Sequence, residues 1–424
     1  MHWILLLVKF MSTNESKMQD LLLYFVDDIE TSFVENDIKL MSKEFEQLII
    51  LSTETIPRNI MLPSNVNVID EYIDWKNFNK IALLCQNIFN FLTIYISECK
   101  SLGKVLPLRE SMAILASNAF KANEIKRQLN LRNVKPNKQT LFYSFWFYDC
   151  IYLAWLKNER YAHKIISRAH GGDVFEERSS LSGKILFRNF QFKLFDHVYS
   201  VSKLGTNYLK YKYPNHTQKI STAYLGSKDP KFTNPFESEV FTIVSCAKIR
   251  DIKRIYLIAE ALMYIDFPIV WYHLGDENLD AKNDPTVAIY KNNINNLKSK
   301  SNVTVHLLGQ LNNDLIFNFY SNTALNLFVS LSSTEGIPVS MMEAISYGIP
   351  ILSTDVGGCN EIVNSETGIL VHKDIDAKDV AQIITNFKDS EMNTNDWRKR
   401  IKSYWSKTFN QDNNHLNFIN LIND

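Results

Sequence analysis

The stretch that decides the fold is Ser332–Val363, which reads SSTEGIPVSMMEAISYGIPILSTDVGGCNEIV. Two carboxylates in it, Glu335 and Glu343, stand eight positions apart. Pro338 between them suits the first turn of a helix, because its φ is fixed and it has no N–H to leave unbonded. Gly336 permits close backbone approach, and a helix N-terminus offers N–H donors with a partial positive charge. The stretch predicts a diphosphate site at a helix tip, flanked by carboxylates that can accept hydrogen bonds from sugar hydroxyls.

Strand-like and helix-like segments alternate on both sides of this stretch. The expected strands of the second half lie at 240–246, 268–274, 303–308, 324–330, 349–353 and 367–371. Those of the first half lie at 22–26, 48–51, 139–145, 163–169 and 196–202. This alternation predicts an α/β fold with parallel sheets covered by helices on both faces. Two such Rossmann-like halves would enclose a ligand cleft between them.

Pro230 and Pro235 mark a break between the halves. We therefore expect an N-terminal domain over residues 1–229 and a C-terminal domain over residues 236–396. Residues 397–424 are expected to form two helices that pack back towards the first domain. Residues 1–20 fit no pattern and receive no role.

The composition excludes several classes of protein. A chain that is 46% hydrophobic and 22% charged is globular rather than disordered. Its 46 basic and 46 acidic residues leave no net charge to favour nucleic-acid binding. Five scattered cysteines form neither a disulfide framework nor a metal site, which indicates a reducing compartment. Trp3–Val8 and Leu141–Leu156 are too short to cross a bilayer. We therefore expect no membrane span and a cytoplasmic location.

A cationic segment, SCAKIRDIKRIYLIAEAL, occupies residues 245–262. The pattern predicts a strand that ends near Cys246 and a helix that begins near Lys253 or Arg254. Cations are unfavourable near a helix N-terminus unless an anion joins them, so the segment indicates an anion site. The alternative is a solvated run of charges.

A third segment, ISRAHGGDVFEE at residues 166–177, places His170 in a turn after a strand that ends at Ser167. A single histidine is more often structural than functional, and both interpretations stay open here. Asp173, Glu176 and Glu177 follow closely and are candidates for the acceptor side of a cleft.

These three stretches together resemble the signatures of retaining GT-B glycosyltransferases of glycosyltransferase family 4. Ser332–Val363 is similar to the E-x7-E segment of that family. Residues 245–262 are similar to its G-R-x4-K region, in which Lys248 stands at the arginine and Lys253 at the lysine. The looser segments 32–45 and 143–156 look like the N-terminal domain of members that make bacterial surface polysaccharides.

The resemblance implies a retaining, metal-independent hexosyltransferase with a GT-B fold and no cofactor. It would move a sugar from a UDP- or GDP-linked donor to a glycan or lipid-linked glycan in polysaccharide biosynthesis. It implies that Glu343 holds the ribose and that Glu335 and His170 face the transferred sugar. The implied donor-binding residues are Lys248, Lys253, Glu335, Gly336, Ile337, Val339 and Glu343, and the implied catalytic residues are His170, Glu335 and Lys253.

Two alternatives to this function remain. One is a nucleotide-sugar 2-epimerase on the same fold. The other is a non-catalytic GT-B partner subunit. Two features favour it: Lys248 stands in place of an arginine, and the first strand is not followed by a Gly-rich loop.

Two further segments could suggest other ligands. Asp374 and Asp376 match the D-x-D motif of metal-dependent transferases. Asp376 is, however, a natural N-cap for a helix that begins near Ala377, so we expect no metal site.

The segment 121–138 holds six basic residues against one acidic residue. It is either a solvated helix or a patch that meets an anionic membrane surface, which would make the protein peripheral to the membrane.

Overall fold

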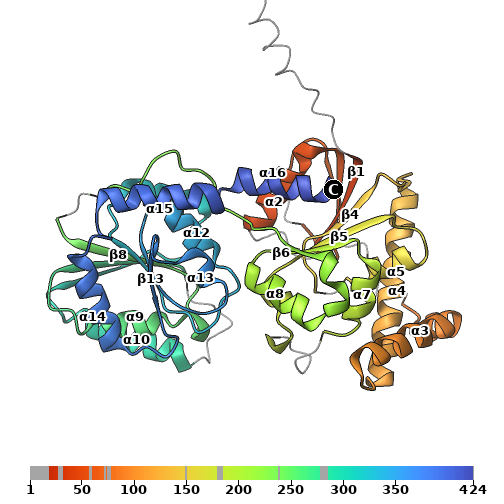
Figure 1. The fold of residues 1–424 in the computed structure, drawn as a ribbon, viewed down its shortest axis with the longest axis horizontal. Coiled ribbons are helices and arrows are strands. Elements are labelled where there is room, and N and C mark those ends of the chain that lie inside the picture. The colour runs from red at the N-terminus through yellow and green to blue at the C-terminus, as the bar shows by residue number, and fades with distance from the viewer. Residues whose placement is uncertain are drawn as a thin grey trace, which may run out of the picture.

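The computed structural model describes residues 19–26, 32–56, 60–70, 73, 78–148, 150–178, 185–236, 239–276 and 285–423. Within these ranges the chain forms two α/β lobes that lie side by side (Figure 1). The remaining residues lie outside the described part. They include Trp3–Val8 and the segment 27–31 after the first strand.

The first lobe is built on a parallel sheet in the order β3-β2-β1-β4-β5-β6-β7. Its strands are β1 (Gln19–Phe25), β2 (Phe45–Leu51), β3 (Val66–Ile69), β4 (Leu141–Ser144), β5 (Lys164–Ala169), β6 (His197–Ser200) and β7 (Ile220–Thr222). Its helices are α2 (Ser32–Glu44), α3 (Lys80–Leu102), α4 (Leu108–Leu131), α5 (Ile151–Asn158), α6 (Gly171–Val174), α7 (Arg188–Leu194) and α8 (Lys203–Lys212).

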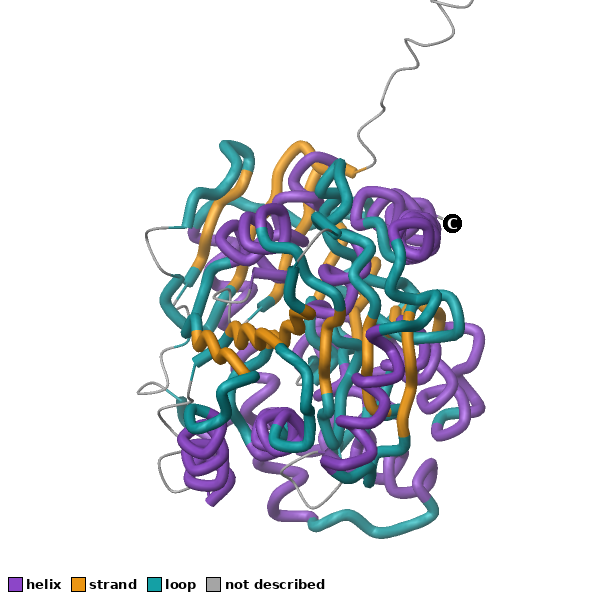
Figure 2. Tube along the Cα trace, turned by 90° about the vertical axis from the view of Figure 1, so that its left-hand side faces the viewer, coloured by secondary structure: helices purple, strands orange, loops and turns teal. Residues whose placement is uncertain are grey.

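The second lobe repeats the design with the order β10-β9-β8-β11-β12-β13. Its strands are β8 (Phe241–Cys246), β9 (Ile269–Leu274), β10 (Val303–Leu307), β11 (Leu327–Ser330), β12 (Ile351–Thr354) and β13 (Gly368–Val371). Its helices are α9 (Ile255–Leu262), α10 (Pro285–Leu297), α11 (Asn313–Asn322), α12 (Val339–Ser346), α13 (Cys359–Ile362), α14 (Ala377–Lys388) and α15 (Asn395–Thr408), and α16 (Gln411–Asn423) ends the described chain. Figure 2 shows the strands between layers of helices, as the alternation predicted.

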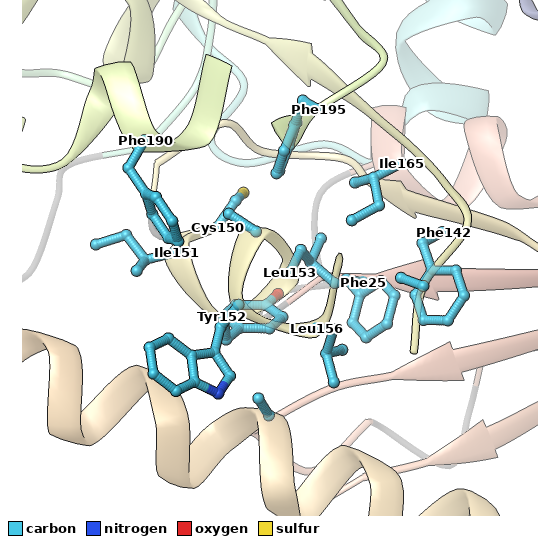
Figure 3. Packing of buried hydrophobic residues seen from close by; sticks show 14 of the residues in the cluster. Phe25, Phe142, Cys150, Ile151, Tyr152, Leu153, Leu156, Ile165, Phe190 and Phe195 are labelled. Atoms are coloured by element: carbon cyan, nitrogen blue, oxygen red, sulfur yellow. The ribbon is translucent and has the colours of Figure 1, made fainter. Parts of the chain in front are cut away.

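Apart from the short edge strands β3 and β7, which were not predicted, the strands form at the predicted apolar runs, because buried parallel strands need apolar side chains on both faces. All four residues of β4 are buried. Phe142 in β4 stacks on Phe25 of the neighbouring β1, with ring centroids 6.1 Å apart, and both lie in the core that α5 covers (Figure 3). The predicted strand near 324–330 is shorter than expected and begins at Leu327.

Helix α3 is an exception to the expectation that no segment could cross a bilayer. Its 23 residues are long and apolar enough to do so by length and composition, and only 17% of its most apolar window is buried. The sequence expectation rested on Trp3–Val8 and Leu141–Leu156 alone. One face of α3 packs on the first lobe, through Phe91, Ile94 and Glu98.

The C-terminal helix joins the two lobes. Helix α15 packs on α12 of the second lobe, and α16 then crosses to the first lobe (Figure 1). Phe418, Ile419 and Ile422 of α16 enter the core of the first lobe, and the Tyr199 hydroxyl donates to the Leu421 carbonyl at 2.8 Å. The lobes that flank the cleft are therefore connected by α16 as well as by the linker after β7.

Candidate functional site

The site is built around the loop and helix that follow β11. Pro338 is the N-cap of α12 rather than a residue of its first turn, with φ −77° and ψ 114°. Its missing N–H leaves no donor unsatisfied there. Glu335 lies in the loop before the helix, and Glu343 lies inside the helix, as the spacing predicted.

A cleft of about 460 Å³ opens between the two lobes at this helix tip. It brings together most of the predicted site residues, namely His170 from the first lobe and Lys253, Glu335, Gly336, Ile337 and Val339 from the second. Leu225 of the linker also lines the cleft. Residues far apart in the sequence therefore face one common space.

Lys253 and Glu335 form an ion pair across the second-lobe side of the cleft. The Lys253 Nζ lies 2.6 Å from Glu335 Oε1, and the two side chains are 25% and 9% exposed. Lys253 ends a short 3-10 turn before α9, and the helix itself begins at Ile255. An ammonium and a carboxylate at a helix tip can bind a phosphate and a hydroxyl respectively.

Two glycines of the loop after β12, Gly357 and Gly358, pack against the backbone of the loop that carries Glu335. The Gly358 N–H donates to the Gly336 carbonyl at 2.6 Å. Gly357 has φ +57°, and a Cβ there would lie 2.0 Å from the Glu335 carbonyl oxygen. Only glycine combines this backbone conformation with such a close approach. The GG pair after β12 therefore fixes the position of Glu335.

The two lobes touch at a pair of glycines. A Cβ on Gly336 would lie 3.1 Å from the Gly171 Cα, so a side chain there would press on the loop that carries His170. Glu361 ties the lobes a second time, because its carboxylate accepts from the backbone N–H groups of Lys203 and Leu204 at 2.7 and 2.8 Å. These N–H groups begin α8, so the carboxylate also meets the positive end of that helix.

His170 is buried at the first-lobe side of the cleft. Its ring lies against Phe145 and Trp146, with centroids 4.6 and 4.5 Å away, and Nε2 lies 3.0 Å from the Phe145 carbonyl oxygen. Burial, and then the charge of Arg168, lower the pKa of His170 to about 3. The ring is therefore neutral near pH 7, and it donates its Nε2–H to the carbonyl.

The predicted turn at His170 needs a correction. Strand β5 continues to Ala169 instead of ending at Ser167, so Arg168 belongs to the strand and His170 is the N-cap of α6. Arg168 is 3% exposed, and its guanidinium lies 3.4 Å from the carboxylate of Asp37. This buried pair links β5 to α2, an arrangement that the sequence pattern did not reveal.

Asp173 and Glu176 have structural partners, which weakens their candidacy for the acceptor side. The Asp173 carboxylate accepts from the backbone N–H groups of Phe147 and His170. Burial raises the pKa of Asp173 to about 7 in spite of these bonds. Glu176 accepts from the Tyr213 hydroxyl and is buried. Glu177 is exposed, and it accepts from the Tyr208 hydroxyl at 3.0 Å.

Glu343 lies beside a second cavity rather than in the main cleft. This small cavity, of about 40 Å³, is lined by Glu343 and Val339 on one side and by Asn36, Asp37 and Arg168 of the first lobe on the other. Burial raises the pKa of Glu343 to about 7. Among the described residues, no hydrogen-bond donor reaches its carboxylate. A buried acceptor without a donor is the local condition that a hydroxyl ligand would relieve.

The remaining predicted cations lie outside the main cleft. Lys248 and Arg250 are exposed in the loop after β8. Arg254, next to Lys253, is also occupied elsewhere, because its guanidinium donates to the carbonyl oxygens of Leu331 and Ser332 at 2.5 and 3.3 Å. Arg254 instead supports the loop that leads to Glu335, and it does so from a left-handed backbone conformation with φ +47°.

An aromatic hollow adjoins the cleft and was not anticipated from the sequence. A hollow of about 340 Å³ is lined by Phe25, Trp146, Tyr148 and Tyr152, together with Gly172. Trp146 and Gly172 also line the main cleft, so the two spaces are neighbours. Aromatic rings suit the apolar faces of sugar rings or other apolar groups.

The D-x-D segment has the local role that its sequence suggested. Asp376 is the N-cap of α14, and its carboxylate accepts from the Asp379 N–H at 2.9 Å. In the part of the chain that the structure describes, no three His, Cys, Asp or Glu side chains are grouped as metal ligands would be.

Comparison with known proteins points to one kind of enzyme for the second lobe. Residues 233–404 match the family described as Glycosyl transferases group 1. The O-antigen biosynthesis glycosyltransferase WbnH of Escherichia coli is 42% identical over 67 residues, which cover 16% of this chain and 18% of that protein. The lipopolysaccharide core biosynthesis mannosyltransferase LpsB of Rhizobium meliloti is 36% identical over 69 residues, 16% and 19% of the two chains. The chain thus matches less than a fifth of the length of these relatives.

Solved structures resemble the whole chain. HepE from Anabaena, in complex with UDP and glucose, has a TM-score of 0.66 over 95% of this chain and 98% of its own, at 14% identity. Sucrose-phosphate synthase from Thermosynechococcus elongatus has a TM-score of 0.68 over 95% and 98%, at 13% identity. Identities this low establish the fold alone. The chain therefore has the GT-B fold that its sequence predicted, with a second lobe similar to the Glycosyl transferases group 1 family.

Proposed function

We propose that this protein is a retaining glycosyltransferase that moves a hexose from a nucleotide-sugar donor to a glycan or lipid-linked acceptor in polysaccharide biosynthesis. The observation that carries the proposal is the Lys253–Glu335 pair at the tip of α12, which faces His170 across the cleft. The named activities of WbnH and LpsB support the reaction class and the surface-polysaccharide setting. The complexes of HepE with UDP and with UDP-glucose support a uridine nucleotide sugar as the donor.

Each residue then has a role in the proposed reaction. The bond from the sugar to the leaving diphosphate breaks, so negative charge grows on the phosphate and positive charge grows on the sugar ring. Lys253 and the N–H groups at Gly336–Val339 would stabilise the phosphate by preorganised electrostatics. Lys248 would join them from its exposed loop. Glu335 would hold the sugar hydroxyls, and Glu343 the ribose.

Retention of configuration would follow from attack on the same face as the departing phosphate. A double displacement needs a carboxylate nucleophile in the cleft. Glu335 is the one carboxylate among the described residues that line it, and Lys253 already pairs with it. The leaving phosphate is then the base that takes the proton of the acceptor hydroxyl.

The deciding experiment is a thermal-shift screen against UDP, GDP, ADP and their sugars, followed by product analysis with the sugar that binds. A ligand that binds the native state alone raises the melting temperature. Conversion of the donor without any acceptor would favour the 2-epimerase. Donor binding without turnover of any acceptor would favour the non-catalytic subunit.

Turnover is expected to survive EDTA. The reason is that Lys253 and the helix tip supply the charge that a divalent ion supplies in metal-dependent transferases. The measurement is the steady-state rate with and without chelator. Full loss of activity that manganese or magnesium restores would contradict this expectation and return attention to Asp374 and Asp376.

Replacing His170 with alanine is expected to lower kcat while the affinity for the nucleoside diphosphate stays within about threefold of wild type. His170 lies on the first lobe, opposite the residues proposed to hold the nucleotide. Because the pKa of His170 is near 3, the wild-type rate should show no loss from protonation of this ring between pH 5 and 8. Unchanged kcat together with a lower melting temperature would show that the histidine is structural.

A further inference from the structure

Helix α3 presents an apolar stripe to solvent. Ile81, Phe89 and Ile96 are 74%, 83% and 48% exposed. At 100° per residue these three side chains fall within a sector of about 80°. From Ile81 to Ser97 the chain has no charged residue. Exposed apolar side chains aligned on one helix face mark an interaction surface rather than chance exposure.

The opposite face of α3 is firmly held by the first lobe, so the stripe is a fixed surface. Phe91 packs on Trp155 with ring centroids 5.2 Å apart. The Glu98 carboxylate is 2% exposed and accepts from the backbone N–H groups of Asn189 and Phe190 at 3.2 and 3.0 Å. Figure 1 shows α3 at the outer edge of the first lobe.

The charges around the stripe favour an anionic partner. Glu98 is the one carboxylate of α3, and it points into the protein. Lys80 and Lys100 stand near the two ends of the helix. The turn into α4 adds exposed Val105 and Leu108, with Lys104 and Arg109 beside them and Glu110 as the single acid.

We propose that α3 and its turn into α4 lie in the interfacial region of an anionic lipid bilayer, with the helix in the membrane plane. Phe89 and its neighbours would enter the acyl boundary while the flanking lysines meet lipid phosphates. The stripe runs along the convex side of a helix and, among the described residues, forms no groove that a protein segment could enter. A bilayer therefore suits this stripe as a partner. The helix does not span the bilayer, because its other face is part of the core.

This surface differs from the basic segment at 121–138, which forms the second half of α4 and the residues after it. There Lys126 pairs with Glu159, and the Arg127 guanidinium lies 2.7 Å from Glu124. Its apolar residues Ala122, Ile125 and Leu129 are buried. The segment therefore has two of its six cations paired with carboxylates and a single large exposed apolar side chain, Leu131, which is 65% exposed. Helix α3 instead has three aligned exposed apolar side chains, with lysines near both of its ends.

The experiment is co-sedimentation of the full chain with vesicles of phosphatidylcholine, alone or with phosphatidylglycerol. Wild type is expected to bind the anionic vesicles roughly tenfold more tightly than the neutral ones. The triple variant Ile81→Ser, Phe89→Ser, Ile96→Ser is expected to lose at least about 30-fold in affinity. The double variant Lys126→Glu, Arg127→Glu is expected to change the affinity for anionic vesicles by less than about fivefold. The assay contains no donor or acceptor, so its result does not depend on the proposed reaction.

Tyr211→Ser is the matched control, because Tyr211 is 89% exposed on α8, away from α3. It should bind vesicles as wild type does, and melting temperatures should show that all variants fold. The proposal is overturned if wild type does not bind anionic vesicles or if the triple variant binds them normally. Loss of binding in the Lys126/Arg127 variant alone would also overturn it. A dimer in light scattering that the triple variant disrupts, without vesicle binding, would instead make α3 a contact between copies of this chain.

Discussion

Replacing Lys253 with methionine is expected to lower kcat/KM by about 10³-fold while the protein stays folded. The methionine keeps the length and apolar stem of the side chain and removes the charge. Negative charge on the leaving diphosphate is larger in the transition state than in the bound donor, so a cation held beside it stabilises the transition state more. Lys253 is held there by Glu335 and by its short turn before α9.

The comparison that isolates this effect uses three further variants. Lys253→Arg keeps the charge and should retain more activity than Lys253→Met. Lys399→Met removes an exposed lysine that pairs with Asp396 at 2.9 Å on α15, and it should leave the rate unchanged. Lys248→Met tests the exposed loop after β8 and should lower kcat/KM less than Lys253→Met does. Normal kcat/KM in Lys253→Met would show that the diphosphate lies elsewhere.

The fold was predictable because its sheets are parallel and buried. Buried parallel strands need continuous apolar runs, and the helices between them need a 3.6-residue period, so the sequence marks both. The run 240–246 became β8 within one residue, and Leu22–Val26 became β1, which begins three residues earlier and ends one residue earlier than predicted. The strand at His170 was placed two residues short, because Arg168 reads as a turn residue until its buried partner Asp37 is known.

The predicted site residues that line the cleft come from three separate stretches of sequence. Glu335 and Gly336 share one loop, whereas Lys253 and His170 were selected because their stretches resemble signatures of a known family. Trp146, Tyr148 and Tyr152 of the aromatic hollow lie close together in sequence, but Phe25 comes from β1, and the sequence does not show that these rings line one space. Exposure is likewise a property of packing, so the stripe on α3 looks like core in the sequence.

The structure also separates the two carboxylates of the α12 region by their surroundings. Glu335 pairs with Lys253, whereas burial without an opposite charge raises the pKa of Glu343 to about 7. The folded state therefore retains a proton on Glu343 between about pH 4.5 and pH 7 that the unfolded chain releases. Below this window Glu343 is protonated in both states and does not lower the free energy of unfolding. Above the window the full cost of burying its charge lowers that free energy. Stability from this group falls as pH rises.

Glu343→Gln is accordingly expected to stabilise the protein and to impair nucleotide binding. At pH 8 the free energy of unfolding should rise by about 3 kcal/mol, and near pH 4 it should not change. A buried carboxylate whose charge costs stability is typical of functional sites. Equal stability of the variant and wild type at pH 8 would show that burial does not raise the pKa of Glu343.

Nucleotide affinity should show the matching pH dependence. Charge-assisted bonds to ribose hydroxyls are worth about 1.5–3 kcal/mol, so Glu343→Gln should weaken nucleotide binding by roughly 10- to 150-fold at pH 8. A nucleotide sugar is the suitable ligand for titration calorimetry, because its esterified phosphates do not titrate near pH 7. Wild-type affinity should rise with pH through about 7, and the affinity of the Gln variant should not.

Glu335→Gln provides the contrast, because Glu335 is proposed to face the sugar rather than the ribose. It should bind the free nucleoside diphosphate within about threefold of wild type and show a depressed kcat. If both variants bind the nucleotide normally, Glu343 does not hold the ribose. If Glu335→Gln alone loses nucleotide affinity, the two carboxylates have exchanged roles, and the one that pairs with Lys253 recognises the ribose.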